Sequence, residues 1–154
     1  MSAKPAVVSS ELQQRLRFEE MLADLSSKFV NLLPAEVDHE IEDALRRVCE
    51  LIGIDFAVLW QWSSDDPDVI MPTHIYPAQK GLQPVQPLHQ EQYPWSVQQM
   101  QAGRMFSISS LEELPAEAAV DRESAFMSGI KSNLCLPLAA GGTPPVGALA
   151  LNTL

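Results

Sequence analysis

The sequence predicts a single α+β domain built on an antiparallel sheet, and three observations support this class. Helical apolar periods occupy the N-terminal third, short apolar runs typical of strands follow, and successive strands are joined by short turns. The chain has 154 residues, of which 46% are hydrophobic and 19% charged, so it can bury one core of ordinary domain size.

Two helices are expected near the N-terminus, after a flexible leader at residues 1–10. From Leu12 to Leu33 apolar residues recur at spacings of four and three, the a/d pattern of a coiled coil (Phe18, Leu22, Leu25, Phe29 and Leu32). Two heptads fit equally well a helix that lies along its own domain. Pro34 ends this pattern, and a second helix over about 35–52 carries one apolar stripe and ends at a glycine cap, Gly53.

The segment 55–62 is short, β-branched and aromatic, with two largely apolar faces, so we expect a strand inside the sheet. The turn signal SSDDPD leads to a second strand over 69–76, in which Pro72 indicates an edge position. Residues 77–93 have no period, and connections of this length are usually functional lids or disordered.

The second half alternates helices and strands. A short helix over 94–102 stops at Gly103, a strand follows over 104–108, and Ser110 with Glu113 fits a capping box. That box opens a helical region that is interrupted at Pro115 and ends at Gly129. Strands over 131–139 and 146–154 form a final hairpin around the turn 141–145.

The formal net charge is −10, which disfavours direct binding to nucleic acid or to anionic membranes. No apolar run is long enough to span a membrane or to serve as a secretory signal. Cys49 and Cys135 are too few for a disulfide framework or a zinc knuckle, so we expect a reducing, cytoplasmic location.

The second half resembles a GAF domain, the small-ligand and signalling module of bacterial sensor kinases and transcriptional activators. The matching steps are the helix ending at Gly103, the Gly-Ile-Lys-Ser step at 129–132, Leu-Pro-Leu at 136–138 and Gly-Ala-Leu at 147–149. The opening, LRFEEMLADLSSKFVNL and EIEDALRRVCELIGID, resembles a subgroup found in sensor histidine kinases and sigma-54-dependent activators. The resemblance covers about residues 12–154, and its strength is the correct order of five weak motifs.

The resemblance implies a GAF-like, PAS-related antiparallel sheet of five to six strands. The N-terminal helices would cover one face, and short helices with the long loop would cover the other. Residues 11–154 would form a sensor domain that binds a small ligand and relays a signal to a separate output domain. GAF domains generally continue into a C-terminal helix after the last strand, which this chain lacks, so we expect a fragment and a homodimer through helix 12–33. The alternative is a dimerisation module whose pocket is filled by its own side chains.

The resemblance also implies a pocket between the sheet and residues 77–130. Ordinary core packing is the competing explanation for each apolar candidate, whereas Ser107 and Asn133 are more informative because polar side chains on strands need partners. The candidate ligand-binding residues are Tyr93, Trp95, Met100, Met105, Ser107, Phe126, Met127, Ile130, Asn133 and Cys135.

Specific cofactors and catalysis are disfavoured. The Asn-Lys…Phe…Asp-Glu series of cyclic-GMP-binding members is missing from the sequence, and neither cysteine precedes the histidine usual in bilin-binding members. His74 and His89 are candidate haem ligands, although a lone histidine is more often a surface or hydrogen-bonded residue. The sequence contains none of the common nucleophile, nucleotide or zinc motifs, and a single cysteine near the pocket cannot support methionine sulfoxide reduction, so we do not expect an enzyme.

Overall fold

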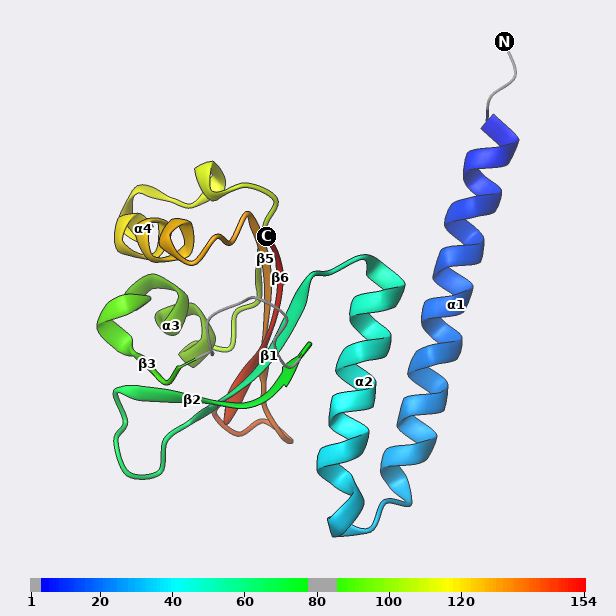
Figure 1. Ribbon diagram of the computed structural model, residues 1–154, viewed down its shortest axis with the longest axis horizontal. Coiled ribbons are helices and arrows are strands. Elements are labelled where there is room, and N and C mark those ends of the chain that lie inside the picture. Colours follow the sequence, from blue (N-terminus) through cyan, green and yellow to red (C-terminus); the bar gives the residue numbers. More distant parts are fainter. Residues whose placement is uncertain (1–3, 78–85) are drawn as a thin grey trace.

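The computed structural model describes residues 4–77 and 86–154, and it contains one six-stranded sheet between two layers of helices (Figure 1). The strand order is β3-β2-β1-β6-β5-β4, and every neighbouring pair is antiparallel. The strands are β1 (Phe56–Trp62), β2 (Val69–Tyr76), β3 (Leu88–His89), β4 (Phe106–Ile108), β5 (Ser132–Leu138) and β6 (Gly147–Thr153). The α+β class is confirmed, with the final hairpin lying beside β1.

The helices divide between the two sides of the sheet (Figure 1). On one side lie α1 (Lys4–Val30) and α2 (Val37–Ile52), and on the other lie α3 (Pro94–Gln101) and α4 (Ala119–Met127). Four 3₁₀ turns complete the described elements: Pro34–Glu36, Gln90–Gln92, Leu111–Glu113 and Ala116–Ala118. This is the two-sided arrangement expected from the sequence.

The first helix begins earlier than its apolar pattern indicated. It starts at Lys4, so residues 4–10 of the expected flexible leader are helical. Pro5 is compatible with this start because the first turn of a helix has no intrahelical N–H bond to lose. Apolar residues recur along the part of α1 that contacts another surface. A helix can extend beyond such a contact, so the apolar period does not show where α1 begins.

Two apolar cores occupy the two faces of the sheet. The residues that alternate along β1 divide between them, as expected for a central strand: Val58 and Trp60 face α3, whereas Ala57 faces α2. On the α2 side, Ala57 and Leu151 pack against Leu45 and Cys49. The α3-side core is larger and contains Phe56, Val58, Trp60, Ile70, Val97, Met100, Cys135, Ala148 and Ala150.

Three local signals in the sequence have the expected structural meaning. Gly53 and Gly129 adopt φ values of 70° and 73°, the left-handed conformation that ends a helix. Gly147 lies so close to β1 that a Cβ atom there would overlap the backbone of Trp60. The Ser110 hydroxyl accepts a hydrogen bond from the Glu112 amide, but it caps a 3₁₀ turn rather than an α-helix.

The edge of the sheet at β2 differs in detail from the expectation. Strand β3, which the sequence did not predict, pairs with β2 only at Val69 and Ile70. Pro72 lies beyond that pairing, where its missing N–H is tolerated. The β1–β2 register shifts beside Thr73, whose hydroxyl donates to the Leu59 carbonyl. The rest of the expected 77–93 connection includes residues 78–85, which lie outside the described residues.

Candidate functional site

The candidate site is the layer between the α3 face of the sheet and helices α3 and α4. Five of the predicted residues meet there. Tyr93, Ile130 and Cys135 belong to or pack against the α3-side core, and Asn133 lies on the same face of β5 as Cys135. Met100, on α3, is also buried in this core. The structure therefore brings these five residues to one side of the sheet.

Trp95 lies at the margin of this layer. Its ring packs edge-on against Phe106, with 5.0 Å between ring centroids, and against the smaller core formed by Ile108, Leu114 and Ala118. This side chain joins α3 to β4 and to the 3₁₀ turns before α4. Trp95 therefore packs outside the site and holds α3 and β4 together.

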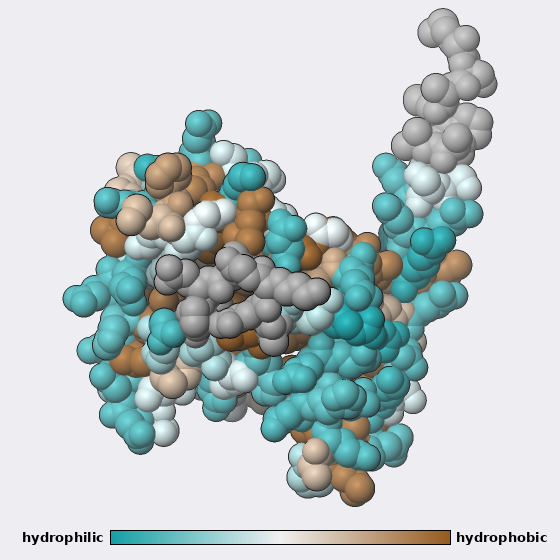
Figure 2. All heavy atoms as spheres, viewed as in Figure 1, coloured by the Kyte–Doolittle hydropathy of each residue, from teal (hydrophilic) through white to brown (hydrophobic). Residues whose placement is uncertain are grey.

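The structure does not bring the other four predicted residues into this layer. Ser107 pairs with Leu134, whose side chain faces α2, so Ser107 points to the opposite side of the sheet from Asn133. Met105 is 63% exposed, and Phe126 and Met127 on α4 are 74% and 81% exposed. Figure 2 shows hydrophobic surface gathered over α4. The expected convergence of Ser107 and Asn133 does not occur, because the two side chains lie on opposite faces of the sheet. The face that each β4 residue takes depends on how β4 pairs with β5, and this pairing cannot be read from the sequence.

Asn133 instead has a partner that the sequence analysis missed. Its amide nitrogen donates to Oδ1 of Asn152 over 2.7 Å, across the β5–β6 register. Asn152 is 3% exposed, so this bond lies in the buried part of the layer. The signal in the sequence was the polar pair Asn152-Thr153 at the end of the otherwise apolar run of β6.

The next pair along the same strands faces the other way. The hydroxyls of Ser132 and Thr153 bond over 2.6 Å on the α2 side of the sheet. The two polar pairs therefore occupy adjacent rungs but opposite faces. Only the asparagine pair adjoins the α3-side core.

Helix α4 fixes the position of α3 through a buried carboxylate. Asp121 is 1% exposed, and its two oxygens accept the backbone N–H groups of Trp95 and Ser96 over 3.1 and 2.7 Å. These amides belong to the first turn of α3, which has no intrahelical acceptors for them. The carboxylate thus caps α3 from a different helix, where the helix dipole also favours negative charge.

The neighbouring Arg122 holds the segment before α4. Its guanidinium donates to the carbonyls of Leu111, at 3.0 Å, and Leu114, at 2.6 Å. These bonds secure the 3₁₀ turns that connect β4 to α4. Together, Asp121 and Arg122 link the elements that cover the site.

The thiol and the phenol of the layer are held in their neutral forms. Burial raises the pKa of the Cys135 thiol to about 12, and burial also raises the pKa of the Tyr93 hydroxyl. A protonated thiol is a poor nucleophile and a poor metal ligand. Among the described residues there is no cluster of three or more His, Cys, Asp or Glu side chains that could hold a metal ion.

Neither candidate haem ligand faces this layer. His74 lies on the α2 side of β2, where its ring nitrogens contact Asp38 at 3.2 Å and Thr73 at 3.1 Å. His89 is exposed on β3. His74 is therefore a hydrogen-bonded residue, and His89 is a surface residue.

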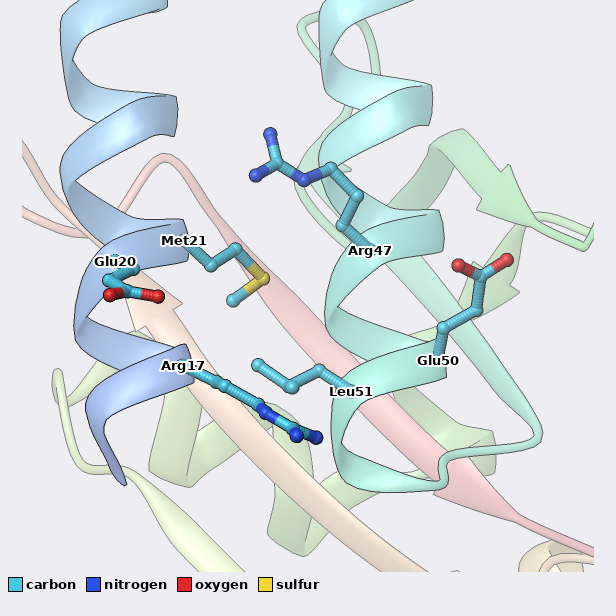
Figure 3. Close-up of a pocket in the computed structure, with 6 residues that line it drawn as sticks. All are labelled: Arg17, Glu20, Met21, Arg47, Glu50 and Leu51. Carbon is cyan, nitrogen blue, oxygen red and sulfur yellow. The ribbon is translucent and has the colours of Figure 1, made fainter. Parts of the chain in front are cut away.

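Two open hollows lie outside the layer. One, of about 460 Å³, separates α1 from α2 and is lined by Arg17, Glu20, Met21, Arg47, Glu50 and Leu51. In Figure 3 Met21 and Leu51 point into this gap, and Glu50 points away from α1. The other, of about 770 Å³, runs beside α4, where Phe126 and Ile130 line it together with Arg122 and Lys131.

Within the described part of the chain, every helix is too short or too polar to cross a membrane.

Comparison with known proteins identifies the fold. No protein-family model matches the sequence, and no curated protein matches it. Among solved structures, the phycocyanobilin-bound GAF domain of a cyanobacterial phytochrome gives a TM-score of 0.67 at 16% identity, over 87% of this chain and 78% of that one. A GAF domain region from Geobacter sulfurreducens PCA gives 0.59 at 17% identity, over 89% and 80%. A GAF domain/HD domain protein from Geobacter sulfurreducens gives 0.55 at 16% identity, over 77% and 74%. The chain therefore has a GAF-like fold.

Proposed function

We propose that this chain is a regulatory sensor domain that binds an uncharged small molecule between the sheet and helices α3 and α4. The observation that carries the proposal is the asparagine pair, Asn133 and Asn152, which places two hydrogen-bonded side-chain amides beside an apolar core. Ligand sites are mostly apolar with a few convergent polar groups, and this layer has that composition. The GAF-domain neighbours support a sensor or regulatory role of this general kind.

The charge of the layer favours a neutral ligand. The residues of the α3-side core are all uncharged, and the Asp121 carboxylate is already bonded to two backbone amides. A buried carboxylate or phosphate would lack a counter-charge here, which is costly. A ligand with adjacent N–H and C=O groups, such as an amide, a urea or a lactam, offers the acceptor and donor that side-chain amides bind.

Successive side chains of β6 lie on opposite faces of the sheet, and this arrangement provides a route by which ligand binding is relayed. Asn152 faces the site, and the preceding residue, Leu151, packs on the opposite face against Leu45 and Cys49 of α2. A shift of β6 on ligand binding would therefore press on α2 and, through it, on α1. The output would be a separate module of the parent protein, of the histidine kinase or sigma-54 activator type, in the reducing cytoplasm that two free cysteines favour. In this proposal the domain itself catalyses no reaction.

A thermal-shift screen with neutral amides, ureas and lactams tests ligand binding, followed by titration calorimetry of any compound that raises the Tm. We expect at least one compound to stabilise the protein, and Asn152→Leu to abolish the effect. The matched control is Thr153→Val, which alters the adjacent rung on the opposite face and should bind as the wild type does. Asn133→Ala serves as a second variant should Asn152→Leu fold poorly. If charged compounds alone stabilise the protein, or if Asn152→Leu responds like the wild type, this ligand assignment is wrong.

A second candidate function is a dimerisation module whose pocket is filled by its own side chains. It is favoured by the packing of the layer, where Val58 and Val97 are each 1% exposed. In that case no compound in the screen would raise the Tm. An Asn152→Leu variant would then differ from the wild type only by the loss of the hydrogen bond with Asn133, which costs about 0.5–1.5 kcal/mol.

A further inference from the structure

Helix α4 leaves large apolar side chains in solvent beside the candidate site. Phe126 and Met127 are 74% and 81% exposed, and Val120, about two turns earlier on the same helix, is 48% exposed. Figure 2 shows hydrophobic surface gathered over this helix. Exposed aromatic and methionine side chains that lie together on a surface are typical of a contact with another molecule.

These side chains border an open groove of about 770 Å³, the α4 groove. One face of α4 forms a wall of this groove, because Arg122, Glu123 and Phe126 line it at helical spacings. Residues 109–112, which precede α4 in the chain, form the facing wall, and residues 129–131 complete the lining. Within the described part of the chain, the groove is lined without any residue of α3 or of the strands, so it opens outside the candidate site.

The α4 groove combines apolar side chains with exposed carboxylates. Leu111 and Ile130 line it together with Phe126. Glu112 and Glu123 contribute exposed carboxylates from the two walls. Within residues 4–77 and 86–154, neither carboxylate takes part in an ion pair. A molecule that enters the groove would therefore meet apolar surface flanked by negative charge.

The two cations of the groove are directed at backbone carbonyls instead of these carboxylates. The Arg122 guanidinium donates to the Leu111 and Leu114 carbonyls, and the Lys131 ammonium donates to the Leu154 carbonyl over 3.1 Å. The whole chain also carries a formal net charge of −10. An anionic membrane, a nucleic acid or a second copy of this acidic chain would be repelled here, whereas a basic partner would be attracted.

We infer that the α4 groove binds an amphipathic helix of another protein, with apolar side chains on one face and lysine or arginine beside them. A helix of this kind lays its apolar face into a hydrophobic groove. Its basic side chains would then lie near Glu112 and Glu123, which gives the contact charge complementarity. The inference goes beyond the proposed function and does not depend on it, because the groove lies outside the candidate site, although Ile130 contributes to both.

Selection of peptides by the full chain tests the nature of the partner. The probe is a phage-displayed library of random peptides of about 16 residues, a length at which an isolated helix is only marginally stable. We expect the enriched peptides to carry apolar residues at intervals of three and four, with lysine or arginine beside them. A synthetic peptide of the enriched consensus should gain helicity in circular dichroism when it binds. Enrichment of acidic peptides, or no enrichment at all, would overturn the inference.

Matched variants locate the contact. Phe126→Ala should raise the Kd of the consensus peptide at least about tenfold in fluorescence anisotropy. Phe18→Ala, the same change at a partly exposed residue of α1, should leave this Kd unchanged. Glu123→Lys should weaken binding at low salt, whereas Glu42→Lys, which changes the net charge equally on exposed surface of α2, should not. Circular dichroism of the variants checks that the fold is retained.

Other occupants give different outcomes. Peptide binding that is lost in Phe18→Ala and kept in Phe126→Ala would place the contact on α1 and overturn the inference. Flotation with phosphatidylserine vesicles that is lost in Phe126→Ala would assign the groove to a membrane. A dimer in sedimentation equilibrium that is lost in the same variant would assign the groove to a second copy. Either of these last results would also overturn the inference.

Discussion

At the start of β6, the α carbon of Gly147 lies against the backbone of the central strand. A Cβ atom built there would overlap the Trp60 carbonyl oxygen and lie 3.0 Å from its carbonyl carbon. Backbone cannot move aside as a flexible side chain can, and β1 is held between two neighbours in the sheet. Glycine is thus required at position 147 by the close approach of two strands, and not by a positive φ angle.

Gly147→Ala should therefore destabilise the domain by about 3 kcal/mol, near the upper end for overpacking. Gly129→Ala is the matched control, since no atom lies within 4 Å of its added methyl group. Its cost should be about 1–2 kcal/mol, from the left-handed conformation alone. Urea unfolding of the three proteins measures both values. Equal losses in the two variants would mean that β6 and β1 are not in such close contact.

The two buried thiols lead to a prediction for alkaline pH. Burial raises the pKa of Cys135 to about 12 and that of Cys49 to about 11. The unfolded chain therefore releases these protons at lower pH than the folded chain does, so stability falls as pH rises from about 9 toward 12. Well below the ordinary thiol pKa both states hold the protons and this contribution is constant.

Cys135→Ala should flatten that decline, which is measured by comparing urea unfolding of the variant and the wild type between pH 8 and about pH 10, a range set by the ordinary thiol pKa. A thiol reagent at pH 8 should react rapidly in urea and slowly in the native protein. Rapid native reaction at Cys135 would contradict its burial.

Single residues also show what could be read from the sequence. Asn133 was singled out because a polar side chain on a strand needs a partner, and that partner is Asn152. Ser107 was chosen by the same logic, but its side chain faces solvent on the other side of the sheet. The difference depends on the pairing register of β4 with β5, which is a property of two strands together. Asn152 could have been found as the first polar residue after the apolar run of β6.

At the scale of elements, α3 depends on α4 for its first turn. The Asp121 carboxylate accepts two backbone amides of α3, and the helix otherwise begins without a side-chain cap of its own. Asp121→Ala should cost about 2–4 kcal/mol, because it leaves two buried donors unpaired. Asp121→Asn keeps one acceptor oxygen and should lose less.

The control for that prediction is Glu123→Ala, an exposed carboxylate on the same helix, which should change stability by no more than about 0.5 kcal/mol. Thermal unfolding gives the order of the variants. Tryptophan fluorescence reports the position of Trp95 separately. An Asp121→Ala protein as stable as the control would show that α3 does not need the cap.

The elements that the sequence predicted well are those whose signals are local. The glycine caps at Gly53 and Gly129 and the two-faced pattern of β1 each depend on a few neighbouring residues. Strand β3 was missed because two residues, Leu88 and His89, carry no period, and they are held by pairing with β2. The start of α1 was missed for a related reason, since a helix that projects from its domain needs no apolar period there.

At the scale of the whole molecule, the sheet separates the candidate site on one side from a helical hairpin on the other. The hairpin is joined by Met21 and Leu25 and by two ion pairs, Arg47 to Asp24 at 2.6 Å and Lys28 to Glu40 at 3.6 Å. Exposed ion pairs of this kind contribute little. The contact of α1 with the domain is therefore smaller than the contacts among the strands.

The small contact of α1 with the domain predicts that its backbone amides exchange faster than those of the central strands. At low protein concentration the amides of residues 9–20 should exchange fastest among the helices, since these side chains are exposed and an isolated helical segment is only marginally stable. Amides of β1 and β6 should exchange slowest, because both strands are paired on two sides.

Raising the concentration should slow exchange within residues 12–33 and leave α3 and α4 unchanged, because the homodimer that the sequence predicts through this helix would cover α1 alone. Mass spectrometry of exchanged peptides resolves the regions. Protection of residues 9–20 equal to that of β6 at low concentration would instead mean that α1 packs against the domain more extensively than its exposed side chains indicate.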